Sequence, residues 1–468
     1  MFGLHVDRQS ALSIARQLCA QLRQRILGGA LPAGTRLPPT RALAAELGIA
    51  RNTVLQVYDQ LIAEGYLAGH VGSGTYVVDL AAEQRADREP ALWAEPAWPL
   101  SAAQADGVIR FDAGMADYRQ FPRAAWALAL REACVTMPEQ SFVLADPQGD
   151  PALRQAICAY LYRAKGIECS PEEVLITPGA TGGVDGLAHV LRSKGSVAVV
   201  EDPCLHFIRN ILLRDGYALK GVPVDAQGMR ADMLDRIQDA RLIYTTPSHQ
   251  FPTGHVLSIR RRLELLRHAR RCGAWIIEDD YDSEFRYVGE PIQSLRHLDP
   301  ERVVYLGSFS KTFSSTLRIG YLIAPPEILD ATRRHMESVN QSAPAAIQRA
   351  LASFLADGQF ERHLYRMKKL YARKRQRLID ELRRVFGAAV TIRGDDAGMH
   401  LLALFEGVRL QQRHFDRLHQ FGVEADWTWE YALDRQTCPN GMILGYGALT
   451  PEETAEGVRR IKLVLQEG

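Results

Sequence analysis

A lysine in the second half of the chain has neighbours that could support covalent chemistry with an aldehyde. Lys311 follows the apolar run 303–307, with Ser308 three residues before it and Arg318 seven residues after it. A lysine amine forms an imine with an aldehyde. A serine hydroxyl and an arginine guanidinium can hold a phosphate group nearby. This spacing therefore indicates a site for an aldehyde that also carries a phosphate.

Two further segments could complete such a site. Asp279 and Tyr281 end another apolar run, and a carboxylate that faces a pyridine nitrogen keeps that nitrogen protonated. We predict that Asp279 makes this contact and that Tyr281 contacts a ring hydroxyl oxygen. Residues 177–179 end a strand and open a helix, where the backbone N–H groups of Ala180 and Thr181 and the Thr181 hydroxyl can receive phosphate oxygens.

The N-terminal segment is suited to a different task, which is contact with DNA. Residues 13–27 and 40–47 have helical apolar spacing, a third helix starts at Arg51 after a short turn, and a glycine-rich hairpin ends near residue 77. This order is typical of a winged helix-turn-helix. Residues 1–78 contain seven arginines, no lysine and four acidic residues, an excess that suits a phosphate backbone. The alternative is a three-helix docking module with surface arginines.

Composition limits the class of protein. The chain has 468 residues, is 47% hydrophobic, and carries 56 basic and 55 acidic side chains, which excludes a chain that is disordered throughout. No apolar run approaches the roughly 20 residues of a membrane helix. The N-terminus also lacks the pattern of a secretory leader. The seven cysteines are scattered and do not form a metal-binding or disulfide pattern. We therefore predict a cytoplasmic protein with reduced thiols and no membrane partner.

The elements that must position these residues follow an α/β pattern. Short apolar runs alternate with helical patterns, which predicts a parallel-dominated sheet with helices on both faces. We place a linker at 79–107, because its composition shifts to Ala, Glu, Asp, Arg and Pro, and the main domain at 108–468. From about 326 the pattern becomes helical and then returns to short strands, so we predict a smaller C-terminal α+β lobe over 326–468. The predicted strands of the main sheet are 174–177, 196–201, 242–245, 275–279 and 303–307.

Six motifs of the chain are characteristic in type and order. They are LPPTR at 37–41, LGIARNTV at 47–54, EGYL at 64–67, GSGTY at 72–76, TPSHQFPTG at 246–254 and EDDYDSEFRY at 278–287. With them, residues 11–78 are similar to the winged helix of GntR-type repressors, and residues 108–468 resemble the fold-type I, pyridoxal-phosphate-dependent aminotransferase domain. Together the two halves resemble the MocR/GabR transcription regulators over nearly the whole chain.

The resemblance implies a cofactor, partners and roles for particular residues. The cofactor would be pyridoxal 5′-phosphate, with Lys311 as the Schiff-base lysine. Its other expected contacts are Asp279, Tyr281, Ala180, Thr181, Ser308 and Arg318. The expected contacts to double-stranded operator DNA are Arg41, Arg51, Asn52, Thr53 and Gly72. The family also implies a head-to-tail homodimer and a small-molecule effector, either pyridoxal phosphate or an amino compound, with target genes in vitamin B6 or amino-compound metabolism.

The sequence departs from working aminotransferases at three positions. Phe251 replaces the asparagine that bonds the ring oxygen, and Leu205 stands where an aromatic residue stacks on the ring. The arginine that clamps a substrate carboxylate would fall near Ile443. Its loss removes a bidentate contact that orients the substrate. His206 or Phe207 could replace the missing aromatic residue.

These departures favour one function over one alternative and leave a second alternative open. We predict a transcription regulator whose aminotransferase-like domain carries out little or no overall transamination. One alternative is a catalytically active aminotransferase with a DNA-binding appendage. The other is a regulator for which pyridoxal phosphate is the sensed ligand rather than a fixed prosthetic group. His206 and Arg209 could contact an effector, although we expect each of them to have a structural role.

Overall fold

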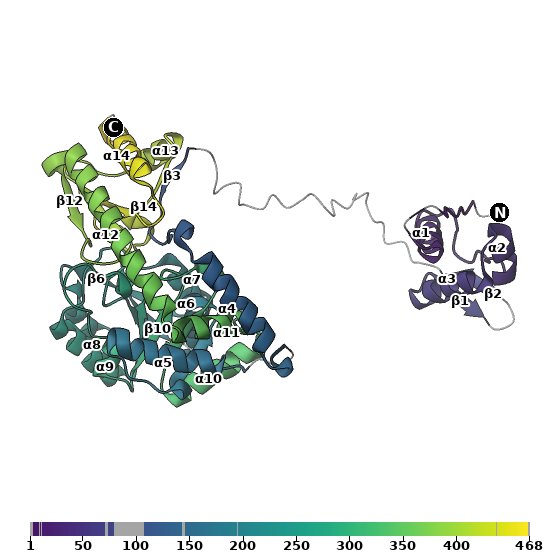
Figure 1. Cartoon of the computed structure of the whole chain (residues 1–468), viewed down its shortest axis with the longest axis horizontal. Coiled ribbons are helices and arrows are strands. Elements are labelled where there is room, and N and C mark those ends of the chain that lie inside the picture. Colours follow the sequence, from purple (N-terminus) through teal and green to yellow (C-terminus); the bar gives the residue numbers. More distant parts are fainter. Residues whose placement is uncertain are drawn as a thin grey trace. The chain divides into compact units, whose positions relative to one another are not determined.

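The chain forms two compact units, Met1–Ser101 and Ala102–Gly468 (Figure 1). The computed structural model describes residues 3–8, 10, 12–70, 74–78, 107–142, 146–193, 195–436 and 438–466. The predicted linker at 79–107 lies outside the described residues apart from Gly107. None of the helices in the described ranges has the length and apolar character needed to cross a bilayer.

The first unit has the order of elements expected of a winged helix-turn-helix. Its helices and strands are α1 (Ile14–Leu27), α2 (Thr40–Leu47), α3 (Arg51–Ala63), β1 (Leu67–His70) and β2 (Gly74–Val77), with β1 and β2 antiparallel. The Ser13 hydroxyl accepts a hydrogen bond from the Arg16 N–H and so caps α1. Gly48 ends α2 at φ 63°, a left-handed conformation that glycine adopts without strain, and the chain turns there into α3.

The apolar face of α3 decides which of its residues remain free for a partner. Val54, Val57 and Leu61 recur at helical spacing and are fully buried in the core of this unit. Arg51 and Asn52, at the start of the same helix, are exposed. Burial of the apolar stripe therefore leaves the first turn of α3 on the surface.

A mixed sheet forms the centre of the second unit. In the described part of the chain its eight strands have the order β4-β11-β10-β9-β8-β5-β6-β7. Strands β7 and β11 pair antiparallel with their neighbours, and the other pairs are parallel. The strands are β4 (Val174–Thr177), β5 (Val197–Asp202), β6 (Ala218–Asp225), β7 (Gly228–Met229), β8 (Ala240–Thr245), β9 (Trp275–Asp280), β10 (Val303–Ser308) and β11 (Gly320–Ile323). The parallel-dominated sheet predicted from the sequence is confirmed.

Helices cover both faces of this sheet, because successive strand residues point to opposite sides. Ile277 packs with α6 (Gly179–Leu191), α7 (His206–Arg214) and α10 (Pro326–Ser338) in one apolar cluster. Its neighbour Ile276 packs in a second cluster with α8 (Ile259–Cys272). The second face is also covered by α4 (Arg123–Thr136), α5 (Pro151–Lys165), α9 (Leu295–Leu298) and α11 (Ala345–Ala356).

A second, smaller sheet forms the C-terminal lobe. Its order is β12-β13-β15-β14-β3. Strand β3, which precedes the large lobe in the sequence, lies parallel to β14 at one edge of this sheet. The long helix α12 extends from this lobe along the larger one (Figure 1). The elements of the lobe are β3 (Ile109–Phe111), α12 (Gln359–Phe386), β12 (Val390–Arg393), β13 (His400–Phe405), α13 (Gln412–Gln420), β14 (Val423–Trp427), β15 (Gly441–Gly445) and α14 (Pro451–Gln466).

The predicted start of this lobe at residue 326 is wrong. Ile328 and Met336 of α10 are buried against α6 and the large sheet, and Phe354 of α11 is buried with α4 and α5. Both helices therefore belong to the large lobe. The helical spacing of 326–356 identified amphipathic helices, but periodicity does not specify which sheet covers their apolar faces.

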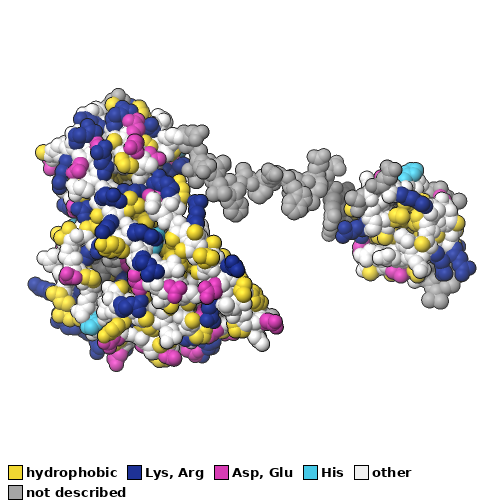
Figure 2. Space-filling model, in the orientation of Figure 1, with side chains coloured by type: hydrophobic (Ala, Val, Ile, Leu, Met, Phe, Trp, Pro, Cys, Tyr) yellow, Lys and Arg dark blue, Asp and Glu magenta, His cyan; other side chains and the backbone are white. Residues whose placement is uncertain are grey.

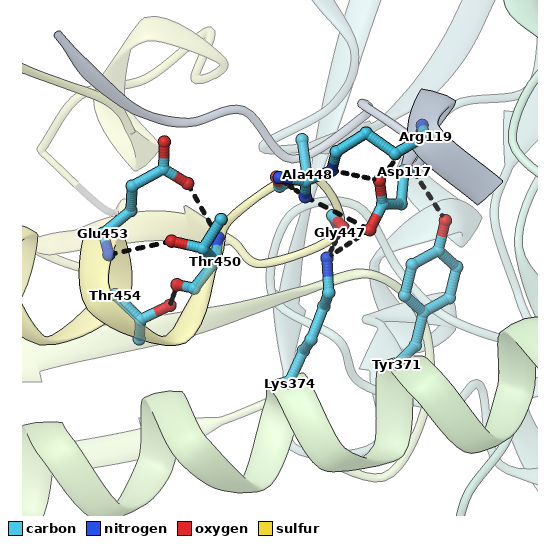
Figure 3. Close-up of polar contacts among 9 residues, drawn as sticks. All are labelled: Asp117, Arg119, Tyr371, Lys374, Gly447, Ala448, Thr450, Glu453 and Thr454. Carbon is cyan, nitrogen blue, oxygen red and sulfur yellow. Dashed lines mark hydrogen bonds and ion pairs between the residues drawn. The ribbon is translucent and has the colours of Figure 1, made fainter. Parts of the chain in front are cut away.

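A buried ion-pair cluster joins three distant parts of the small lobe (Figure 3). Asp117 accepts from Arg119 Nε and from Lys374 Nζ of α12, each at 2.7 Å, and its backbone N–H donates to the Tyr371 hydroxyl. Lys374 also donates to the Gly447 carbonyl at 2.6 Å. Burial alone would raise the pKa of Asp117, but Arg119 and Lys374 hold the pKa below its ordinary value. The cluster fixes α12 against the segments that follow β3 and β15.

Asp117→Asn tests how much this cluster contributes to the free energy of unfolding. Removing one member of a buried ion pair leaves its partners uncompensated, so we expect the free energy of unfolding at pH 7 to fall by about 3 kcal/mol. Because the pKa of Asp117 is depressed in the folded state, its contribution is complete above about pH 4 and is lost as the pH falls further. Urea titrations at pH 7 measure the difference. The exposed Asp380→Asn, on the same α12, is the control, and equal stability of the two variants would contradict the prediction.

Candidate functional site

A cavity of about 310 Å³ lies at the carboxyl ends of the parallel strands. It contains every residue that the sequence predicts as a cofactor contact. Those lining residues are Ala180, Thr181, Asp279, Tyr281, Ser308, Lys311 and Arg318. They come together because the carboxyl ends of parallel strands meet at one edge of a sheet, where ligands of α/β folds bind.

Lys311 lies in the turn after β10, with its amine inside the cavity. Its Nζ donates a hydrogen bond to the Gly114 carbonyl at 2.8 Å. Burial lowers the pKa of Lys311 from its ordinary value, against the opposing effect of Asp112, Asp282 and Asp279. A lower pKa increases the neutral fraction of the amine, which is the form that attacks a carbonyl carbon.

Asp279 has one satisfied and one unsatisfied carboxyl oxygen. The Tyr244 hydroxyl donates to Oδ2, whereas Oδ1 is buried and has no hydrogen-bond partner among the described residues. The side chain is only 4% exposed, and burial raises the pKa of Asp279 to about 7. An unsatisfied buried oxygen is costly, and a ligand N–H at that position would satisfy it.

Tyr281 is held by a buried pair behind the cavity. Its hydroxyl oxygen lies 3.1 Å from His249 Nδ1, and the same nitrogen lies 3.0 Å from Asp282 Oδ2. Burial alone would lower the pKa of His249, but the Asp282 carboxylate raises it above its ordinary value. The tyrosine hydroxyl is therefore fixed in position by groups that do not line the cavity.

The residues predicted to hold phosphate converge at the start of α6. Ala180 and Thr181 occupy its first turn, where backbone N–H groups have no helical partner. Arg318 adopts φ 53°, and its Nη2 donates to the Pro178 carbonyl at 3.3 Å. Gly320 permits this close approach, because a Cβ at that position would lie 2.6 Å from the Gly179 carbonyl carbon. The cavity thus offers an anion site, an amine and a carboxylate acceptor, and this set fits pyridoxal phosphate.

Two of the three departures from aminotransferases line this cavity, and the third lies in the apolar core. Phe251 and Leu205 line it, and His206 and Phe207 line it beside them. Ile443 is fully buried behind Phe251 in a small apolar cluster. The position at which a carboxylate-clamping arginine is expected is therefore part of the core.

Some lining residues were not predicted from the sequence. Asp112 and Gly114 follow β3, and Asp426 and Tyr431 belong to β14 and the segment after it. These residues come from the small lobe, so their meeting with Lys311 depends on the packing of the two lobes. Tyr244, which bonds Asp279, was also missed, although a tyrosine within the apolar strand predicted at 242–245 was a detectable signal.

The predicted DNA contacts lie at two helix starts of the first unit. Arg41 is exposed in the first turn of α2, Arg51 and Asn52 are exposed in the first turn of α3, and Thr53 is half-buried. Figure 2 shows arginine side chains, in dark blue, on the visible face of this unit. Gly72 lies outside the described residues.

Both units match families of known proteins. Residues 14–77 match the family described as "Bacterial regulatory proteins, gntR family". Residues 106–436 match the family described as "Aminotransferase class I and II". The second unit also resembles solved aminotransferases. An archaeal alanine:glyoxylate aminotransferase is 29% identical with a TM-score of 0.72, over 78% of this chain and 92% of that chain. LysN, the alpha-aminoadipate aminotransferase of Thermus thermophilus, is 25% identical with a TM-score of 0.69, over 78% of this chain and 94% of that chain.

Relatives that span both units decide the family. The probable rhizopine catabolism regulatory protein MocR of Rhizobium meliloti is 35% identical over 98% of this chain and 95% of its own length. The chain belongs to the MocR/GabR-type regulators. Two further relatives of this MocR/GabR-type chain are transcriptional regulators by name. They are TauR of Rhodobacter capsulatus, 32% identical over 97% of both chains, and the pyridoxine biosynthesis regulator PdxR of Corynebacterium glutamicum, 34% identical over 79% of both chains.

Asp279→Asn tests how the buried carboxyl of Asp279 affects the pH dependence of stability. In protein prepared without added ligand, Asp279 keeps its proton up to about pH 7 when folded but loses it near pH 4 when unfolded. The folded state therefore binds more protons in this range, and its stability falls as the pH rises. The substitution removes this effect, so we expect the melting temperature to fall less between pH 5 and pH 8 in the variant than in the wild type. The same pH dependence in both proteins would contradict this prediction.

Proposed function

We propose that this MocR/GabR-type regulator binds pyridoxal phosphate through Lys311 and controls transcription in response to a small amine or to the cofactor itself. The observation that carries the proposal is the unsatisfied Oδ1 of Asp279, which lies in the same cavity as the Lys311 amine. A protonated pyridine nitrogen is the complement of that oxygen, and an aldehyde is the complement of that amine.

The remaining contacts follow from the same geometry. The N–H groups at the start of α6, with Ser308 and Arg318, hold the phosphate. Tyr281 donates to the ring oxygen from a position fixed by His249. When bound, pyridoxal phosphate supplies an aldehyde that can exchange amines, together with an electron-withdrawing ring. The chain supplies the orientation and the counter-charges.

Lys311→Ala tests the attachment. We expect borohydride reduction of the wild type to fix the cofactor on Lys311, and we expect the variant to lose both the visible absorbance and the fixed adduct. Peptide mass spectrometry locates the modified lysine. Lys220→Ala, an exposed lysine on β6, is the matched control and keeps the adduct. An adduct on a lysine other than Lys311 would refute the assignment.

Overall transamination is expected to be slow or absent. Among the described residues that line the cavity, the one arginine is Arg318, and this proposal assigns it to the phosphate. Without a second arginine a substrate carboxylate lacks the bidentate contact that fixes the reacting carbon. The alternative, an active aminotransferase with a DNA-binding appendage, requires steady-state turnover of about 1 per second or more, which is the low end for ordinary enzymes.

The first unit is proposed to read operator DNA. Its GntR-type match and the exposed first turn of α3 support entry of that helix into a major groove, with Arg41 at a phosphate. A head-to-tail homodimer would present two such units to two half-sites. Binding to operator DNA requires that the protein and the DNA share a compartment. This requirement supports the cytoplasmic location expected from the sequence.

Arg51→Ala and Arg41→Ala should have different effects on DNA binding, the first on sequence preference and the second on affinity for all sequences. If Arg51 contacts a guanine edge, its loss should cost about 1 to 3 kcal/mol at the operator and relax the preference for one base in each half-site. The loss of Arg41 should weaken binding to all sequences and reduce the salt dependence by roughly one unit of slope. Gel-shift titrations at several salt concentrations measure both effects. Deletion of residues 1–78 is the control, and operator binding by the truncated chain would contradict the proposal.

A further inference from the structure

The cavity has an acidic wall that the cofactor does not use. Asp112 and Asp426 both line it. The parallel register of β3 and β14 pairs Phe111 with Ala425, so Asp112, which directly follows the end of β3, comes next to Asp426 of β14. Two negative charges this close to each other repel. A wall of this kind is explained if a cation binds between the two carboxylates.

Other contacts hold the acidic wall in place and act on the charge of Asp426. The Tyr431 hydroxyl donates to Asp426 Oδ2 at 3.0 Å, and the His206 ring lies 5.4 Å from the Tyr431 ring. Burial raises the pKa of Asp426, and the nearby Asp112 raises it further, against the opposing effect of the hydrogen bond from Tyr431. Asp112 is thus close enough to disfavour the charge of Asp426, and a positive ligand would relieve this repulsion.

The cavity offers no comparable site for a carboxylate. Among its described lining residues the lysine and arginine side chains are Lys311 and Arg318, and both are assigned to the cofactor. Arg209 is nearby in sequence, but its guanidinium donates to the carbonyls of Ala432 at 2.8 Å and Glu430 at 2.9 Å. It therefore holds the segment that carries Tyr431, as expected of a structural residue.

We propose that the effector of this regulator is an amine that carries a second ammonium group, which Asp112 and Asp426 bind, and that it is not an amino acid. The inference rests on the proposed function, which places the first amine of the effector at the aldehyde next to Lys311. The unsatisfied Oδ1 of Asp279 is the independent sign that this cavity is a ligand site.

Three ligands with equal carbon chains test the end-group preference. Full-length protein loaded with pyridoxal phosphate is titrated with 1,4-diaminobutane, 1-aminobutane and 4-aminobutanoate, whose far ends are cationic, neutral and anionic. Binding is followed by the change in the visible spectrum of the cofactor. Because hydrogen bonds to charged groups are worth more than neutral ones, we expect the diamine to bind at least about tenfold more tightly than 1-aminobutane, and 4-aminobutanoate to bind most weakly.

Neutralising the wall should remove this preference. Asp426→Asn and Asp112→Asn keep the side-chain shape and the acceptor that Asp112 offers to the Gly114 N–H. We expect each to bring the affinity for the diamine close to the affinity of the same variant for 1-aminobutane. Asp416→Asn, an exposed aspartate on α13 of the same lobe, is the matched control and should keep the preference.

The outcomes separate this inference from the proposed function. If no chromophore forms on Lys311, the proposed function fails. If the chromophore forms but 4-aminobutanoate binds as tightly as the diamine, or if no amine changes the spectrum, the inference on the effector fails while cofactor binding stands. An unchanged diamine preference in both aspartate variants would also overturn it.

Discussion

A carboxyl buried at the end of a parallel strand governs the site in the second unit. Asp279 lies at the edge where β8, β9 and β10 end, almost without solvent, and Tyr244 satisfies only one of its oxygens. Burial of this kind favours the protonated form unless a positive group is brought in. The neighbouring strand β10 ends at the same cavity and is followed by Lys311. The sheet therefore buries a carboxyl that a positive ligand would stabilise, and the ends of its strands form the cavity in which such a ligand fits.

The two lobes supply different residues to the cavity. Every residue assigned to the cofactor comes from the large lobe, whereas Asp112, Asp426 and Tyr431 come from the small one. The junction is well defined, because Asp202 of the large lobe accepts from the backbone N–H groups of Leu433 and Asp434. Within the small lobe the cluster around Asp117 fixes α12. In this fold, which resembles solved aminotransferases, residues of both lobes thus line one cavity.

Local patterns in the sequence were enough to predict the cavity residues of the large lobe but not those of the small lobe. Lys311, Ser308 and Arg318 lie within eleven residues of one another, and their spacing relative to a strand end carries the signal. Asp112 and Asp426 are 314 positions apart and meet only because β3 joins β14. No periodicity encodes that pairing. The misplaced start of the small lobe has the same origin, since an amphipathic helix does not specify its partner surface.

The unsatisfied oxygen of Asp279 also bears on the stability of the folded chain. A buried acceptor without a partner costs about 1 to 3 kcal/mol, and a ligand that supplies the missing donor binds the folded chain and not the unfolded one. Ligand supply then shifts the fraction of chains that open and meet a protease. Under this arrangement a cell short of the ligand would hold fewer copies of the regulator, so that turnover adds a slow response to the rapid one at the operator.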